Sequence, residues 1–319
     1  MFSISSEIII GKFKLPYFTE ININSRQDLL MDICTISFPT RLDANGKKIT
    51  DFIKSGDLVT VKLGYNNRKV QRFKGYVNKI LPGRHTTIEC LDEGQPYSFL
   101  LTEKTYNLRN TTFLKLFSAI APKIPLNITD ANIGDWDVLK DVSIFKVIDE
   151  LKKKFNILPY FRNGVLTFAK SDISGMVLLD FQKNMPLDSD DLKLYQGGQS
   201  NYFIKGESKA IEGGKSVYNI VYFSKDGRSD KKPAGLLGGE IKIPGLSLSQ
   251  LSDLCKNKYQ TISSDGLTGT ATTFGEPYVQ HGQLARIKDI TRLDLQGDYF
   301  IKSVQTVVNE SRFRQILGF

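Results

Sequence analysis

The chain has 319 residues, of which 40% are hydrophobic and 24% are charged, a composition typical of a soluble protein with two or three domains. The apolar run 8–10 is too short for a signal peptide, and no small-residue cleavage site follows it. No stretch is long and apolar enough for a transmembrane helix, so we expect neither export nor membrane insertion.

The net charge of +9 raises the question of nucleic-acid binding, but the basic excess is spread thinly over the chain. Nucleic-acid binders usually concentrate such charge in a stripe or a tail. The densest basic run, Lys152–Lys154, ends an amphipathic segment, where cations are favourable beside the dipole of a helix. We therefore interpret this run as a solvated face.

The three cysteines, Cys34, Cys90 and Cys255, lie far apart in the sequence and show no CxxC spacing. Each has apolar neighbours, which is typical of a reduced thiol packed in a core. The pattern therefore favours neither a zinc site nor a disulfide framework.

Residues 1–100 are predicted to form β-structure. In the segment 56–65, Val59, Val61 and Leu63 share one face by period-two alternation. Turn residues at 66–69 and 82–83 separate this strand from two more, at 72–80 and 86–91. The three strands form an antiparallel meander.

From about residue 105 the apolar spacing changes to that of helices. The first predicted helix begins after Thr111 or Thr112 and ends before Pro122, and the second begins after Ser143. Asn163-Gly164 then stands between two apolar runs, which predicts a type I′ hairpin turn. Residues 105–185 are thus expected to form a small α/β domain.

The last part of the chain returns to β-structure. Strands are predicted at 202–210 and 216–223, and a short helix at 249–259. Because residues 224–240 are rich in Gly, Ser, Asp, Lys and Pro and lack periodicity, we expect a mobile surface loop there. A final meander is predicted at 284–290, 299–308 and 312–319.

The two meanders resemble one another. GDLVTVK at 56–62 matches GQLARIK at 282–288, and related strands at 76–80 and 300–304 begin 20 and 18 residues after the two glycines. Hairpins share glycine and β-branched residues by chance, so duplication is one of two explanations. If it is correct, three copies of the chain would present six equivalent modules.

Three segments together resemble the phage late control protein D family, the central hubs of phage tails, and the hub part of VgrG-type spikes. They are residues 56–92, 145–168 and 269–308, and their order and spacing carry the resemblance. It implies a mainly β fold with an α/β insert, in which two tube-like antiparallel β-barrel domains flank a small α/β domain. The implied domains are 1–102, 103–188 and 189–319, the last with the mobile loop 224–240.

The family's residues at the matching positions are structural. Gly56 and Gly282 would begin equivalent barrel strands at tight turns, and Gly75 and Gly297 would allow a bulge or a close approach of the backbone. The resemblance implies no cofactor, no metal and no enzymatic activity.

The resemblance also implies the partners. The chain would be a homotrimeric baseplate hub, assembled in the bacterial cytoplasm, that joins a six-fold tail tube or tube-initiator protein to a three-fold spike protein. Other baseplate proteins would surround it in the virion tail or injection particle, and genome or effector would only pass through. Because the sequence stops at Phe319, without the oligosaccharide-binding-like domain and β-helical needle of VgrG-type proteins, we expect the spike to be a separate chain.

Two alternatives stay open. A tail-associated cell-wall hydrolase would need paired carboxylates, and Asp92-Glu93 is the obvious pair, although neighbours on a strand point to opposite faces. We interpret this pair as an exposed strand-end turn. A basic nucleic-acid-binding module could use Lys62 and Lys288 in a channel, but alternation toward solvent explains both equally well.

Other candidate ligand residues have simpler explanations. Asp188, Asp190 and Asp191 could bind calcium, but the glycine and terminal glutamate of a calcium loop are missing, which favours a linking turn. His85 and His281 lie outside any metal-binding spacing, and we expect both to be solvent-facing turn residues.

Overall fold

The chain folds into two compact units. In the computed structural model we describe residues 3–40, 48–155, 157–168, 175–185, 191–195, 202–212, 215–263 and 266–319. Unit 1 comprises Met1–Pro96, Pro159–Leu194 and Leu267–Phe319, and unit 2 comprises Tyr97–Leu158 and Tyr195–Gly266.

The divisions between these units lie elsewhere than the predicted domain boundaries at 102/103 and 188/189. Strands from both ends of the chain pair in one sheet, so residues 1–96 and 267–319 belong to the same unit. The hairpin near residue 163, predicted as part of the α/β domain, also lies in unit 1. The segment 202–263, predicted as part of the second barrel, lies in unit 2.

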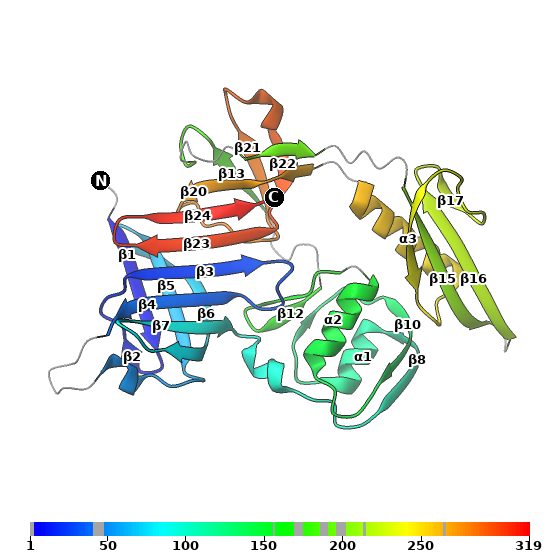
Figure 1. The fold of residues 1–319 in the computed structure, drawn as a ribbon, viewed down its shortest axis with the longest axis horizontal. Coiled ribbons are helices and arrows are strands. Elements are labelled where there is room, and N and C mark those ends of the chain that lie inside the picture. Colours follow the sequence, from blue (N-terminus) through cyan, green and yellow to red (C-terminus); the bar gives the residue numbers. More distant parts are fainter. Residues whose placement is uncertain are drawn as a thin grey trace. The chain divides into compact units, whose positions relative to one another are not determined.

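A ten-stranded sheet dominates unit 1 and confirms the mainly β prediction (Figure 1). Its order is β2-β1-β5-β6-β7-β4-β3-β23-β24-β20. The C-terminal strand β23 pairs antiparallel with β3 from Ser303 opposite Arg26 to Asn309 opposite Glu20. The strands are β1 (Ile4–Ile10), β2 (Phe13–Lys14), β3 (Glu20–Arg26), β4 (Ile33–Pro39), β5 (Leu58–Tyr65), β6 (Arg68–Leu81), β7 (His85–Asp92), β20 (Thr270–Phe274), β23 (Ser303–Asn309) and β24 (Phe313–Gly318).

Smaller elements complete unit 1. The strands β13 (Met176–Asp180), β21 (Leu284–Lys288) and β22 (Gly297–Phe300) form a second sheet, with β13 parallel to β21. The hairpin β11 (Tyr160–Arg162) and β12 (Val165–Thr167) turns at Asn163-Gly164, whose φ angles of 52° and 75° are those of a type I′ turn. Its short 3-10 helices are η1 (Ile49–Phe52) and η3 (Leu293–Leu295), and the short strands β14 (Lys193–Tyr195) and β19 (Gly266–Thr268) lie at its limits. The 3-10 helix η2 (Gln95–Phe99) crosses from unit 1 into unit 2, and the short strand β9 (Leu126–Asn127) belongs to unit 2.

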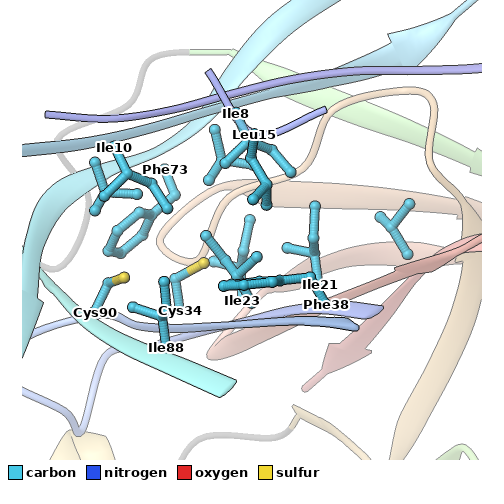
Figure 2. Close-up of a cluster of buried hydrophobic side chains, with 14 of the residues drawn as sticks. Ile8, Ile10, Leu15, Ile21, Ile23, Cys34, Phe38, Phe73, Ile88 and Cys90 are labelled. Carbon is cyan, nitrogen blue, oxygen red and sulfur yellow. The ribbon is translucent and has the colours of Figure 1, made fainter. Parts of the chain in front are cut away.

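The core of unit 1 follows the alternation along its strands. Val59, Val61 and Leu63 of β5 are fully buried, as their spacing predicts. Cys34 on β4 lies directly opposite Cys90 on β7, and both side chains point into the same apolar cluster (Figure 2). Each large aliphatic side chain buried there stabilises the fold by about 1.5–3 kcal/mol.

Unit 2 contains the three α-helices found among the described residues. The strand β8 (Tyr106–Thr112) pairs with β10 (Asn132–Val138), and α1 (Phe113–Ile120) and α2 (Ile144–Phe155) coincide with the predicted helices. The hydroxyl of Thr112 accepts a hydrogen bond from the Lys115 amide (3.3 Å), which caps α1. Within the described residues, no helix is both long enough and apolar enough to cross a bilayer.

A four-stranded sheet and α3 (Leu248–Ser263) form the rest of unit 2, in the order β17-β16-β15-β18. The strands are β15 (Tyr202–Glu212), β16 (Lys215–Ser224), β17 (Gly227–Ser229) and β18 (Leu237–Lys242). The prediction of a loop at 224–240 does not hold throughout, because β17 and the start of β18 lie within it. Gly238 on β18 serves close packing: a Cβ there would lie 2.3 Å from the ring of Phe203.

Candidate functional site

Unit 1 contains the same tight turn twice. Gly56 and Gly282 both have φ +88°, a conformation that glycine adopts without steric cost. The Gly56 amide donates to the Val77 carbonyl oxygen (2.8 Å), and the Gly282 amide donates to the Ile301 carbonyl oxygen over the same distance. The two glycines thus begin their strands in the same way.

Side chains close both turns in the same manner. The Lys54 amide donates to Asp57 Oδ2 (2.7 Å), and the Gln280 amide donates to Gln283 Oε1 (2.8 Å). The carboxylate of Asp57 and the side-chain amide of Gln283 therefore make the same hydrogen bond at equivalent positions of the two turns. We call β4–β7 module 1, and β20–β24 module 2.

The strands that follow also correspond. Leu58 and Leu284 are 42% and 43% exposed, and the residues after them, Val59 and Ala285, are fully buried. Strand pairing aligns Leu58 with Tyr76 and Leu284 with Phe300. The sequence match between the two meanders thus extends to hydrogen bonds, backbone angles and exposure.

Gly75 and Gly297 are not equivalent to each other. Gly75 lies opposite Val59, whereas the residue opposite Ala285 is Tyr299. A Cβ on Gly75 would lie 2.0 Å from the Leu91 carbonyl oxygen, so β6 and β7 approach closely there. The three atoms nearest to a Cβ on Gly297 all belong to the side chain of Tyr299, the closest at 3.0 Å.

The tip of the β5–β6 hairpin of module 1 contacts module 2. The Tyr65 ring packs against Phe313, with 5.2 Å between the ring centroids. The Tyr65 hydroxyl donates to the Phe313 carbonyl oxygen (3.2 Å) and accepts from the Gly275 amide (3.2 Å). The two modules are therefore in direct contact, in addition to their connection through β3, which pairs with both β4 and β23.

Arg72 on β6 reaches the same place, and its side chain is 1% exposed. Its Nη2 donates to the Gly275 carbonyl oxygen (2.8 Å) and to Glu276 Oε1 (2.8 Å). The guanidinium lies 4.1 Å from the centroid of the Tyr278 ring, a cation–π contact. A buried cation with these partners fixes the relative position of the two modules.

Gln315 on β24 completes this junction and is fully buried. Its Oε1 accepts from Arg72 Nη1 (3.3 Å) and from the Val279 amide (3.1 Å). Its Nε2 donates to the carbonyl oxygens of Phe274 (2.9 Å) and Pro277 (2.8 Å). One side chain thus holds both the loop of module 2 and the arginine of module 1.

A polar cavity of about 240 Å³ lies beside the junction, lined among others by Asp32, Asp92, Arg162 and Tyr278. Burial raises the pKa of Asp32 to about 6, although the Ser25 hydroxyl donates to it (2.7 Å). Burial, and then the nearby Asp32, raise the pKa of Asp92 well above its ordinary value. Two carboxyl groups therefore share a poorly solvated site.

The Asp92-Glu93 pair is not the exposed turn that the sequence suggested. Asp92 is 8% exposed and accepts from the amides of Asp32 (2.7 Å) and Gly94 (2.7 Å). Glu93 forms an ion pair with Lys74. Asp92 therefore binds two backbone amides at the end of β7, whereas Glu93 pairs with Lys74.

His281 is also buried, at 1% exposure, contrary to its predicted solvent-facing position. Arg162 Nη2 donates to its carbonyl oxygen (2.8 Å) and lies 3.1 Å from its Nε2. Burial, and then the Arg162 charge, lower the pKa of His281 to about 3. A neutral ring that packs edge-on against Tyr160 is a packing residue, whereas His85 is exposed.

The remaining candidate residues that the structure describes do not come together. Asp188 and Asp190 lie outside the described residues, and Asp191 accepts from the Thr270 amide (2.7 Å). Lys62 forms an ion pair with Glu7 (2.9 Å), and Lys288 is exposed at the end of β21. Over the ranges described above, no three His, Cys, Asp or Glu side chains are grouped as metal ligands.

Sequence reasoning missed Arg72, Gln315 and Tyr65. Their partners lie 203 to 248 positions away along the chain, so no local pattern reveals the contacts. The repeat in the sequence was the one signal for these contacts, because two modules in one unit need a surface at which they pack together.

Comparison with known proteins extends this description. No family model matches the chain, and no curated protein matches its sequence. Solved structures do match. A 43 kDa tail protein of prophage MuSo2 from Shewanella oneidensis is 14% identical, with a TM-score of 0.63 over 98% of this chain and 97% of that one.

Two further solved structures have a similar fold. A tail protein from Neisseria meningitidis MC58 is 13% identical, with a TM-score of 0.65 over 99% of this chain and 95% of that one. The E. coli c3393 protein, described as a component of the type VI secretion system, is 8% identical, with a TM-score of 0.57 over 97% of this chain and 75% of its own. The chain therefore has the fold of phage tail proteins and their relatives.

Proposed function

We propose that a chain with this tail-protein fold is the central hub of a contractile tail or injection machine. It would act as a homotrimer that joins a six-fold tail tube to a three-fold spike carried on a separate chain. The observation that carries the proposal is the repeated module, with matching turns at Gly56 and Gly282 in one unit.

Symmetry explains why such a repeat is useful. A closed ring of three identical chains has three-fold symmetry, but two equivalent modules in each chain give it six similar units. One face of the ring can then match a six-fold partner while the other matches a three-fold partner. A chain with one module could satisfy only one of these symmetries.

The proposed role needs no catalysis. The buried polar groups described above bind the backbone and join the two modules. Asp92 accepts hydrogen bonds from two backbone amides, and Gln315 donates to two carbonyl oxygens. Tube, spike and other baseplate proteins are the proposed partners, and genome or effector would pass through the ring.

The mass of the purified chain in solution tests the proposal. We expect a mass three times that of one chain, and averaged images with three strong and six weaker repeats around the axis. A chain that stays monomeric at every accessible concentration, or a monomer that cleaves peptidoglycan, contradicts the hub function.

A further inference from the structure

The contact between the modules is directional. The hairpin tip of module 1, residues 64–72 (tip 1), packs on a corner of module 2 formed by Gly275 and Phe313 (corner 2). At that corner the Gly275 amide donates to the Phe313 carbonyl oxygen (3.1 Å). Because the modules are equivalent, each should possess both a tip and a corner.

The corresponding tip of module 2 is the connection between β21 and β22, residues 289–296 (tip 2). It presents Ile290 and Leu293 at 67% and 69% exposure. These two side chains, three residues apart, give tip 2 an apolar surface that a partner can cover.

Tip 2 is held rigidly. The carboxylate of Asp289, which is 2% exposed, accepts from the amide (2.8 Å) and hydroxyl (2.7 Å) of Thr291. Gln182 Nε2 donates to the same carboxylate (3.2 Å), and Gln296 Nε2 donates to the Asp289 carbonyl oxygen (2.6 Å). A segment ordered in advance loses little conformational entropy when it binds.

The corresponding corner of module 1 is formed by Thr40 and Arg84 (corner 1). The Thr40 amide donates to the Arg84 carbonyl oxygen (3.1 Å), the same bond at the same length as in corner 2. Arg84 is exposed, and so is Leu81 three residues before it, at 52%. Corner 1 therefore offers apolar surface and the aliphatic stem of an arginine.

We infer that tip 2 of one copy docks on corner 1 of the next copy, repeating between chains the contact that tip 1 makes with corner 2 within one chain. The inference rests on the proposed trimer and assigns its interface. The contact uses two different surfaces, so it is heterologous and closes a ring only when every copy both gives a tip and receives one.

A designed cross-link tests the contact directly. In a double variant with Leu293→Cys and Arg84→Cys, oxidation should give covalent dimers and trimers on a non-reducing gel, and each single variant should give neither. The native thiols, Cys34, Cys90 and Cys255, are fully buried and do not compete.

A second variant tests the energetics. Ile290→Asp with Leu293→Asp should raise the concentration needed for trimer formation at least about tenfold, because two charges would enter the interface. The matched control is Ile211→Asp with Leu237→Asp, at side chains 79% and 75% exposed, which should leave assembly unchanged. Circular dichroism confirms that each variant is folded.

The outcomes separate the two proposals. Trimers that survive Ile290→Asp with Leu293→Asp and give no cross-link would overturn this interface and leave the hub function standing. A wild-type chain that never trimerises would overturn the hub function itself.

Discussion

Among single residues, Arg72 has several partners across the module junction. It bonds Gly275, Glu276 and Gln315 while its side chain is 1% exposed. Replacing it with alanine leaves Gln315 short of a donor and opens a void beside Tyr278. Because the Glu276 carboxylate is 45% exposed, no buried charge is left unpaired, and we expect Arg72→Ala to lower the free energy of unfolding by about 1–3 kcal/mol, measured by urea titration.

A conservative replacement of Arg72 tests whether the guanidinium itself is needed. Lysine keeps the charge, but it lacks the planar guanidinium that bonds Gly275 and Gln315 while it stacks on the Tyr278 ring. Arg72→Lys should therefore recover only part of the stability that Arg72→Ala loses. Arg68→Ala, at an exposed position on the same strand, is the matched control and should change stability by less than about 0.5 kcal/mol. Equal, small effects at both positions would show that the junction does not depend on Arg72.

Asp32 predicts a dependence of stability on pH. Its folded pKa of about 6 lies above that of an unfolded aspartate, so the folded state binds the proton more tightly. Stability contributed by this group is therefore present below about pH 4 and is lost as the pH rises to 6. At pH 7, Asp32→Asn should be more stable than the wild type, on the order of 1 kcal/mol.

Thermal unfolding from pH 4 to pH 7 measures this effect. The variant's advantage should grow across that interval and then level off. Asp28→Asn, an exposed neighbour paired with Arg26, is the control and should show no such gain. An advantage that shrinks as the pH rises would mean that the Asp32 carboxylate is stabilised in the fold.

At the scale of elements, the close approach of β6 and β7 at Gly75 is a sensitive contact. A Cβ there would lie 2.0 Å from the Leu91 carbonyl oxygen and 2.7 Å from Asp92 Cα, and backbone cannot move aside cheaply. Gly75→Ala should lower the free energy of unfolding by about 1–3 kcal/mol in a urea titration. Gly266→Ala, where a Cβ meets nothing within 4 Å, should have little effect.

Elements defined by local spacing were the ones that the sequence could predict. The helices α1 and α2 and the strand β5 follow apolar periodicities that are readable within a dozen residues. β18 was missed because its pairing with β15 joins Leu237 to Tyr202, and its glycines look like loop residues until the packed rings are known. His281 was misplaced for the same reason, since its burial depends on Arg162, 119 positions away.

At the scale of the whole chain, the repeat was predictable and the division into units was not. Matching residues at 56–62 and 282–288 reveal two modules, but nothing local shows that both belong to one unit. The chain passes between the units at residues 96/97, 158/159, 194/195 and 266/267. A linear map of domains cannot represent a chain that returns to its first unit twice.

The pairing of β3 with β23 also has a consequence during synthesis. β3 is complete at Arg26, but its partner begins only at Ser303. At about 5–20 residues per second, the ribosome needs roughly 15–60 s to make the intervening chain. For that time the edge of a hydrophobic sheet stands open on the nascent protein, where another unfinished chain could add a strand. To fold without aggregation, the protein should therefore depend on chaperones, or on slow initiation of translation, more than its modest size suggests.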